Sequence, residues 1–330
     1  MWANTACPPN RLKLRSPPSR TKADLCLHAL ERREYFMSDL LEKIRQSRAT
    51  RRRFMKQAGV AGLGVLGATH LGEVDLLAQS GELNDVKILN FALNLEYLEA
   101  EFYLRAAFGR GLSDSDVTGT GRLGPVIGGR QVPFATESIR EYAEEIAADE
   151  EAHVRFLRAG LGNVAVARPT IDLQDSFTKA ARAAGLIGPT ETFDPYANEN
   201  NFLLAAYIFE DVGVTAYKGA ARFLSNKDFL EAAAGILAVE AYHASNIRTV
   251  LYARGFFDAA QRISDLRDAA DGPADLDQGI VMNGKANIVP ADANGIAFSR
   301  TPTQVLSIVY LGGRSAGFGF FPNRLNGAIR

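Results

Sequence analysis

The chain has 330 residues, 47% of them hydrophobic and 9% aromatic, a composition that is typical of folded globular proteins and excludes a disordered chain. The formal net charge of −1 hides an asymmetry, because residues 1–56 hold 14 Lys and Arg against 5 Asp and Glu, whereas the remainder holds 23 against 33. No basic stripe lies beyond residue 57, so we expect no nucleic-acid partner. Both cysteines lie before residue 57, so we exclude disulfides, cysteine-ligated zinc and iron–sulfur clusters from the body of the chain.

Residues 1–36 are expected to contribute nothing to the fold. They contain proline-rich stretches without helical or strand periodicity, which predicts disorder. Met37 begins a stretch of ordinary signal-peptide length, so we expect translation to start there, which would leave residues 1–36 untranslated.

Residues 37–80 are interpreted as an export signal. The sequence TRRRFMK (50–56) precedes QAGVAGLGVLGATHL (57–71), so a charged region is followed by a short, glycine-rich apolar region. This order resembles a twin-arginine signal with Arg51 and Arg52 as the defining pair. The resemblance implies the twin-arginine (Tat) export machinery as a partner and a periplasmic or other extracytoplasmic location, with the signal helix either cleaved or retained at the membrane. A basic arm before a small-residue helix is the alternative.

Four stretches beyond residue 83 show helical periodicity with few helix breakers, which predicts an all-α protein. These stretches are 84–108, 136–162, 199–224 and 227–255. Asn84 and Thr136 are suitable N-caps for the first two, and Gly160 and Gly162 are expected to stop the second.

The linkers between these stretches favour a ferritin-like four-helix bundle over residues 84–255. The linker 163–198 must cross the length of a helix and is expected to hold a short helix near 173–186. The last two helices are joined by only three residues (225–227), so they are expected to be antiparallel neighbours. One long crossover between the second and third helices is the arrangement of ferritin-like bundles.

Residues 256–330 are expected to form a C-terminal extension packed on the bundle. A short helix is expected at 257–270. The glycine-rich sequence at 312–327 lacks periodicity, which predicts a long irregular tail.

Two Glu-x-x-His pairs indicate a metal site. Glu150 and His153 lie in the second helical stretch, and Glu240 and His243 lie in the fourth. A spacing of three places both side chains of a pair on one face of a helix, where a carboxylate oxygen and an imidazole nitrogen can bind the same cation. These are the only two histidines beyond residue 70, and each has a glutamate three residues before it.

The first and third helical stretches carry a second repeat. Glu96 is followed seven residues later by Tyr103, and Glu210 is followed seven residues later by Tyr217. Seven residues are almost two helical turns, so each tyrosine lies on the face of its glutamate. We expect a pseudo-twofold bundle with the site on its axis, in which Tyr103 and Tyr217 are the candidate catalytic residues, with hydroxyl groups that bond ligand carboxylates.

Glu99 is an alternative to Glu96 as the ligand from the first helix, because the two lie one turn apart. The acidic residues Glu144, Glu145, Asp149 and Glu151 of the second helix are expected to form a solvated face. Four converging carboxylates are costly to bury, and two divalent cations would neutralise their charge.

The constellation resembles the ferritin-like superfamily of di-iron and di-manganese carboxylate proteins. It is most similar to exported ferritin-like proteins related to plant desiccation proteins, through LNFALNLEYLEAEFY in the first helix and GFGFFPNRLNG in the tail. The resemblance implies two divalent metal ions, iron or manganese, as cofactors, with Glu150 and Glu240 bridging them and Glu96 and Glu210 as terminal ligands. It implies this full set of metal ligands: Glu96, Glu150, His153, Glu210, Glu240 and His243.

Two functions agree with such a site. The first is a redox function, as a ferroxidase, a peroxidase or a catalase-like enzyme that acts on dioxygen or peroxide. The second is a non-catalytic envelope stress or desiccation-protective protein whose metal site is structural. A homodimer fits either function, whereas the long linkers and the tail argue against a storage cage. The four helices contain no methionine, which excludes a methionine-ligated haem.

Overall fold

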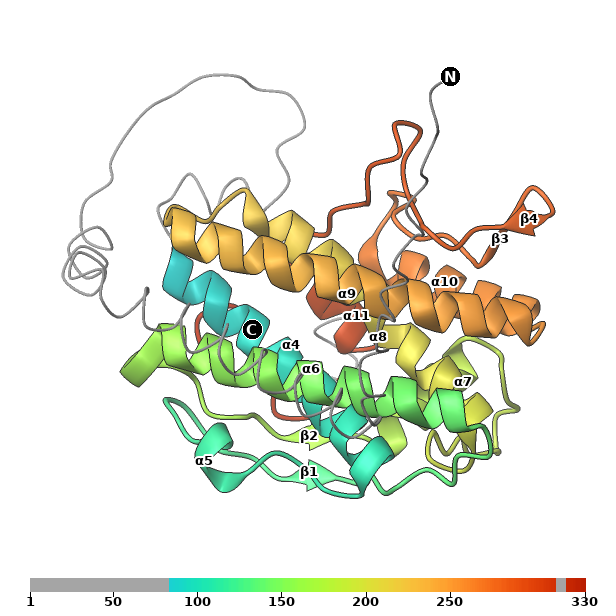
Figure 1. The fold of residues 1–330 in the computed structure, drawn as a ribbon, viewed down its shortest axis with the longest axis horizontal. Helices are drawn as coiled ribbons and strands as arrows, with labels where there is room; N and C mark the ends of the chain where they lie inside the picture. The colour runs from blue at the N-terminus through green and yellow to red at the C-terminus, as the bar shows by residue number, and fades with distance from the viewer. Residues whose placement is uncertain (1–82, 313–318) are drawn as a thin grey trace, which may run out of the picture. The chain divides into compact units, whose positions relative to one another are not determined.

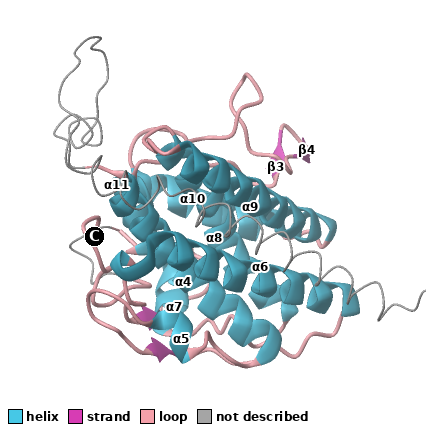
Figure 2. Ribbon diagram, turned by 60° about the vertical axis from the view of Figure 1, so that its left-hand side comes forward, coloured by secondary structure: helices cyan, strands magenta, loops and turns pink. Residues whose placement is uncertain are grey.

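A computed structural model describes residues 83–312 and 319–330, so the signal predicted at 37–80 and the segment 1–36 lie outside the described residues. Nearly all of the regular structure within the described residues is helical (Figure 2), and the predicted all-α fold is confirmed. None of the described helices has the length and apolar character that crossing a bilayer requires.

Four long helices form the body of this part of the chain (Figure 1). They are α4 (Asp85–Phe108), α6 (Glu137–Leu161), α8 (Glu199–Ala221) and α9 (Lys227–Ala253). The shorter elements are α5 (Asp114–Val117), β1 (Val126–Ile127), the 3-10 helix η1 (Gly162–Val164), β2 (Ile171–Asp172), α7 (Asp175–Ala183), α10 (Phe257–Asp271), β3 (Val281–Met282), β4 (Lys285–Ala286) and α11 (Pro302–Val309). Strands β1 and β2 pair in parallel, and β3 and β4 pair antiparallel.

The helix ends follow the capping residues of the sequence. The side chain of Asn84 accepts a hydrogen bond from the backbone of Lys87, as expected for an N-cap. Thr136 stands at the N-cap position of α6 but its hydroxyl bonds Glu199 instead of the helix backbone. Helix α8 ends at Ala221, three residues before the predicted end.

Helices α4 and α6 form one antiparallel pair, and α8 and α9 form the other. The start of α4 lies beside the end of α6, because the Asn90 side chain bonds the Val164 carbonyl oxygen. The start of α8 lies beside the start of α6, because Glu199 accepts hydrogen bonds from the backbone N–H groups of Ala135 and Thr136. The linker between α6 and α8 therefore crosses the length of the bundle, as the sequence predicted.

The central helices are buried on almost every side. In α4, 19 of 24 residues are buried, and in α8 18 of 23 are, whereas α6 and α9 bury only 9 of 25 and 9 of 27. Helix α8 packs against α4, α9, α10 and α11. Two of these four neighbours belong to the C-terminal extension, so the extension completes the core of the bundle.

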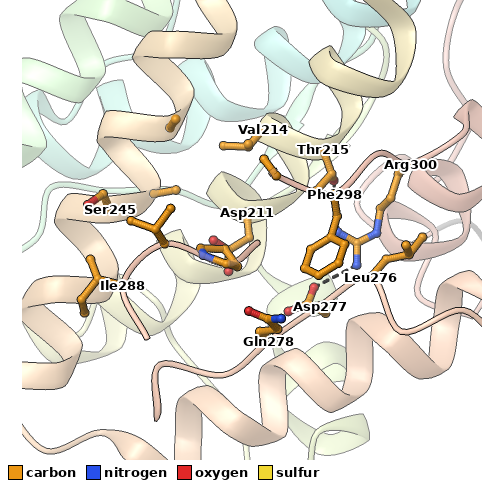
Figure 3. A pocket seen from close by; sticks show the side chains of 15 residues that line it. Asp211, Val214, Thr215, Ser245, Leu276, Asp277, Gln278, Ile288, Phe298 and Arg300 are labelled. Carbon is orange, nitrogen blue, oxygen red and sulfur yellow. Dashed lines mark hydrogen bonds and ion pairs between the residues drawn. The ribbon is translucent and has the colours of Figure 1, made fainter. Parts of the chain in front are cut away.

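Buried arginines fix the extension to α8 and α9, among them Arg267 of α10, which pairs with Asp211 of α8 at 2.8 Å. The guanidinium of Arg248 donates to Asp211 at 2.7 Å and to the carbonyl oxygens of Gln278 and Gly279. Arg300 pairs with Asp277 at 2.9 Å, as Figure 3 shows. The sequence predicted coil after residue 270, and α11 was not predicted.

Candidate metal centre

The four long helices bring the six predicted ligand residues to one buried place. Helices α4 and α8 carry Glu96 and Glu210, while α6 and α9 carry the two Glu-x-x-His pairs. All four glutamates are fully buried, and both histidines are less than a tenth exposed. Their convergence follows from the pairing of α4 with α6 and of α8 with α9.

The imidazole of His153 is surrounded by carboxylates from three helices. Its Nδ1 atom lies 3.2 Å from an oxygen of Glu96, 3.4 Å from Glu150 and 3.9 Å from Glu240. These four residues each offer a ligand atom, and the four atoms lie within 4.8 Å of one another. A single cation could contact all four.

A second set of donors lies beside the first. The Nδ1 atom of His243 is 3.1 Å from Glu150 Oε1 and 3.7 Å from Glu210 Oε2. Glu150 approaches His153 through its Oε2 atom and His243 through its Oε1 atom. One carboxylate thus faces both imidazoles, whose ring centres are 6.4 Å apart.

The two candidate tyrosines bond one oxygen each of Glu96 and Glu210. Tyr103 of α4 donates to Oε1 of Glu210 on α8, and Tyr217 of α8 donates to Oε1 of Glu96 on α4. Each tyrosine therefore bonds the glutamate of the opposite helix. Residues seven apart lie about 10.5 Å apart along a helix, which is too far for a tyrosine to bond the glutamate of its own helix.

The inner atoms of the cluster are left without hydrogen bonds. Among the described residues, fourteen buried side-chain atoms lack a hydrogen-bond partner, and eight of them belong to this cluster. They are Glu96 Oε2, Glu150 Oε1 and Oε2, His153 Nδ1, Glu210 Oε2, Glu240 Oε1 and Oε2, and His243 Nδ1. Buried polar atoms are normally satisfied, so eight inward-facing donor atoms fit a metal centre that would bind them.

In the metal-free protein, burial and mutual repulsion hold protons on the carboxylates. Burial raises the pKa of Glu96 to about 7 and of Glu210 to about 8, and raises the pKa of Glu240 well above its ordinary value. Glu150 differs, since the adjacent imidazoles of His153 and His243 outweigh its burial and lower its pKa. Protons would therefore compete with a metal ion for the same atoms.

Asp149 is a site residue that the sequence interpretation missed. We expected it on a solvated face, but its Oδ2 atom lies 3.3 Å from Nε2 of His243. Burial alone would lower the pKa of His243, but the contacts with Asp149 and Glu150 raise it to about 10. A carboxylate behind a histidine fixes the orientation of the ring and presents its other nitrogen to a metal. Its position directly before Glu150 was the only feature of the sequence that could have indicated that Asp149 lies at the site. Glu151 is not part of the cluster and pairs with Arg110 at 3.0 Å.

Glu99 lies beside the cluster, outside the group of four residues around His153. It is 5% exposed, and burial together with the carboxylates of Glu150 and Glu210 raises its pKa well above the ordinary value. The equivalent position on α8 is Gly213, where a Cβ atom would lie 2.2 Å from Glu240 Oε2 and 3.5 Å from Glu99 Oε1. Gly213 therefore makes room for the carboxylate of Glu240.

Comparisons with known proteins agree with this geometry. Residues 84–253 match the family described as Ferritin-like domain. The chain is 35% identical over 244 residues to the desiccation-related protein PCC13-62 of Craterostigma plantagineum. The aligned residues cover 68% of this chain and 76% of that protein. It is also 30% identical over 265 residues to the ferritin-like catalase Nec2 of Nesocodon mauritianus. These aligned residues cover 74% of this chain and 84% of that protein. No solved structure matches the chain.

Proposed function

Because the chain belongs to the ferritin-like family, we propose that its buried cluster binds two divalent ions, iron or manganese, and catalyses redox turnover of peroxide or dioxygen. The observation that carries this proposal is the set of eight buried donor atoms without hydrogen-bond partners. Mixed carboxylate and imidazole ligands suit iron and manganese. A relative named as a ferritin-like catalase supports the redox function.

The residues have distinct tasks in this proposal. Glu150 would help to hold both ions, because its two oxygens face different histidines, and Glu240 would be a further carboxylate ligand from α9. Tyr103 and Tyr217 hold the outer oxygens of the terminal glutamates, so that the other oxygen of each faces inward. Bound iron or manganese would supply electrons to peroxide or dioxygen at coordination positions that the protein ligands leave open.

A second candidate is a protective protein with a structural metal site. The match to a protein named desiccation-related favours it. In that case the metals would stabilise the folded chain by joining four helices, and the loaded protein would consume no peroxide. The two candidates share the ligand set and differ only in turnover.

The test combines metal analysis with peroxide consumption. Elemental analysis of the protein from its native compartment should give two iron or manganese ions per chain, and the loaded protein should consume hydrogen peroxide. Glu150→Gln should lose metal, while the neighbouring surface variant Glu151→Gln should keep it. Loaded protein without peroxide or dioxygen turnover would favour the protective candidate, and equal metal contents in the two variants would contradict the ligand assignment.

The export proposal concerns the leader. A site built from four helices exists only after folding, and loading before export would let the cell choose the metal. We therefore propose twin-arginine export of the folded, loaded protein, as a monomer or a homodimer. Replacing Arg51 and Arg52 with Lys should leave loaded protein in the cytoplasm, whereas normal export of this variant would contradict the proposal.

A further inference from the structure

The exposed face of α9 carries no charged residue between Glu231 and Arg254. The exposed residues of this stretch are Ala234, Gly235, Ala238, Ala241, Tyr242, Thr249 and Ala253. Its ionisable residues other than Tyr242 and Tyr252 are Glu240, His243 and Arg248, and all three are buried. Helix α6, which also buries only one side, exposes seven residues, and four of them are charged: Glu137, Glu141, Glu145 and Arg155. A solvated helix face normally carries charge, whereas the centre of a protein interface is depleted of it.

Tyr242 is the most prominent side chain on this face of α9. The residue is 76% exposed, the largest fraction among the large hydrophobic residues that the structure describes. Ala238 and Ser245 lie one helical turn before and after it on the same face, so its ring stands on a surface of small residues. Tyrosine is among the residues that most often anchor an interface by filling a pocket of the partner.

A pocket lies beside Tyr242, between α8, α9 and the extension (Figure 3). Ala241 and Ser245 line it from α9, and Val289 lines it from the extension. Ala241 is exposed and Val289 is 70% exposed, so the pocket reaches the surface next to Tyr242. It offers room of about 70 Å³ for the centres of water-sized molecules. One water needs about 10–15 Å³ by this measure, so the pocket has space for roughly five to seven heavy atoms, the size of a phenol ring.

The lining of this pocket suits an uncharged group. Its charged residues Asp211, Asp277 and Arg300 already form buried ion pairs. Much of the remaining wall is apolar, with Phe298 on the side of the extension. The hydroxyl group of a buried tyrosine needs a hydrogen-bond partner, and the lining includes polar groups such as the hydroxyl of Ser245.

We propose that this face of α9 binds a second copy of the chain, with Tyr242 of each copy in the pocket of the other. An exposed aromatic ring and a pocket of its size lie next to each other on one surface. In a dimer with twofold symmetry the same patch meets itself, so each ring finds a pocket in the other copy. Two identical charged faces would repel each other, whereas two uncharged faces do not. The inference concerns assembly and holds for either of the two functions proposed above.

The area of the face indicates a dissociable dimer. From Ala234 to Ala253 the face is about 29 Å long and about 10 Å wide, which is roughly 300 Å² in projection. The extension around Val289 adds to this area. Permanent dimers bury about 2,000 Å² or more in total, so this interface belongs to the smaller class. We therefore expect monomer and dimer to exchange at micromolar concentrations.

The first test measures mass against concentration. In sedimentation equilibrium of the full chain, the average mass should rise with concentration from 35.8 kDa towards twice that value. Tyr242→Ala should raise the dissociation constant of the dimer at least hundredfold, because each dimer loses the contact twice. Ala241→Leu should have the same effect, since it fills the mouth of the pocket and leaves Tyr242 in place.

Two matched variants serve as controls for the mass measurement. Phe108→Ala removes an exposed aromatic ring at the end of α4, and Ala148→Leu enlarges an exposed alanine of α6. Both should form dimers as wild type does. All four positions are at least partly exposed, so the variants should fold, and their melting curves check this.

The second test identifies the group that fills the pocket. The compound 4-methylphenol has the ring and the hydroxyl group of a tyrosine side chain. It should bind Tyr242→Ala with one site per chain, as measured by NMR, and it should dissociate the dimer of wild type. The double variant with Tyr242→Ala and Ala241→Leu should not bind it, because its pocket is filled.

Three outcomes would overturn the proposal. Wild type that stays monomeric at every concentration would remove its basis. A dimer that neither Tyr242→Ala nor Ala241→Leu weakens would mean that another surface joins the copies. If 4-methylphenol enters the pocket of wild type only after residues 1–80 have been cut away, the leader and not a second copy occupies this face.

Discussion

Binding of manganese(II) to the metal-free protein should release protons, and more of them at pH 6 than at pH 9. At pH 6, Glu96 and Glu210 still hold protons, because burial raises their pKa values to about 7 and about 8. At pH 9 both have lost them, whereas His243, with a pKa raised to about 10, still holds its proton. Ligand atoms must be deprotonated to bind metal, so the release should fall by at least about two protons between these pH values.

Calorimetry can measure this release. Titrations under argon, each in two buffers of different ionisation enthalpy, give the number of protons released per chain at each pH. By linkage, the logarithm of the apparent affinity should rise with pH, and its slope should be steeper by about two at pH 6 than at pH 9. Equal proton release at the two pH values would refute the competition between protons and metal at Glu96 and Glu210.

The same pKa values determine how the stability of the metal-free protein depends on pH. A carboxyl group with a raised pKa in the folded state stabilises the fold below its ordinary pKa, and this stability is lost as the pH rises through the folded value. For Glu96 and Glu210 the loss runs from pH 4.5 to about 8. Metal-free protein should therefore melt at a lower temperature at pH 9 than at pH 6, and two divalent ions should reverse this order.

Three further predictions concern residues around the cluster. In metal-free Asp149→Asn the pKa of His243 should fall from about 10, because the variant loses the carboxylate beside Nε2. An NMR titration of the His243 imidazole that gives an unchanged pKa would contradict this contact. Tyr217→Phe should keep both metals but bind them 10–100-fold more weakly, as is typical when the partner of a ligand is lost, and competition with a chelator measures this. Arg248→Met should lower the free energy of unfolding by about 3–5 kcal/mol, because it leaves the buried Asp211 without one of its two arginines. Denaturant unfolding measures this change, and a midpoint equal to that of wild type would contradict the structure.

Helical periodicity predicted the four long helices because their apolar residues recur with a helical period over many turns. The ends of α4, α6 and α9 lie within two residues of their predicted positions, since Asn84, Gly162 and Gly255 mark them in the sequence. The residues on the inner faces were also readable, because a spacing of three or seven fixes the face of a helix.

Contacts between elements could not be read in this way. Periodicity tells which face of a helix a tyrosine occupies, and not which neighbouring helix it reaches, so the bond from Tyr103 to the glutamate of α8 was not predictable. In the sequence Asp149 resembled Glu144, Glu145 and Glu151, the acidic residues expected on the solvated face of α6, and only the position of His243 on α9 distinguishes it. Helix α11 is only eight residues long, too short for its periodicity to distinguish it from coil.

The burial of α8 on almost every side has a consequence for synthesis of the chain. A ribosome delivers α8 before α10 and α11, so the nascent helix presents apolar residues such as Phe209 before final neighbours such as Phe320 exist. Chains are synthesised at about 5–20 residues per second, so this exposure lasts several seconds or longer. Folding of the core must therefore wait until the residues of α11 have left the ribosome, and a nascent chain that pauses after α9 is the species most exposed to aggregation and most in need of a chaperone.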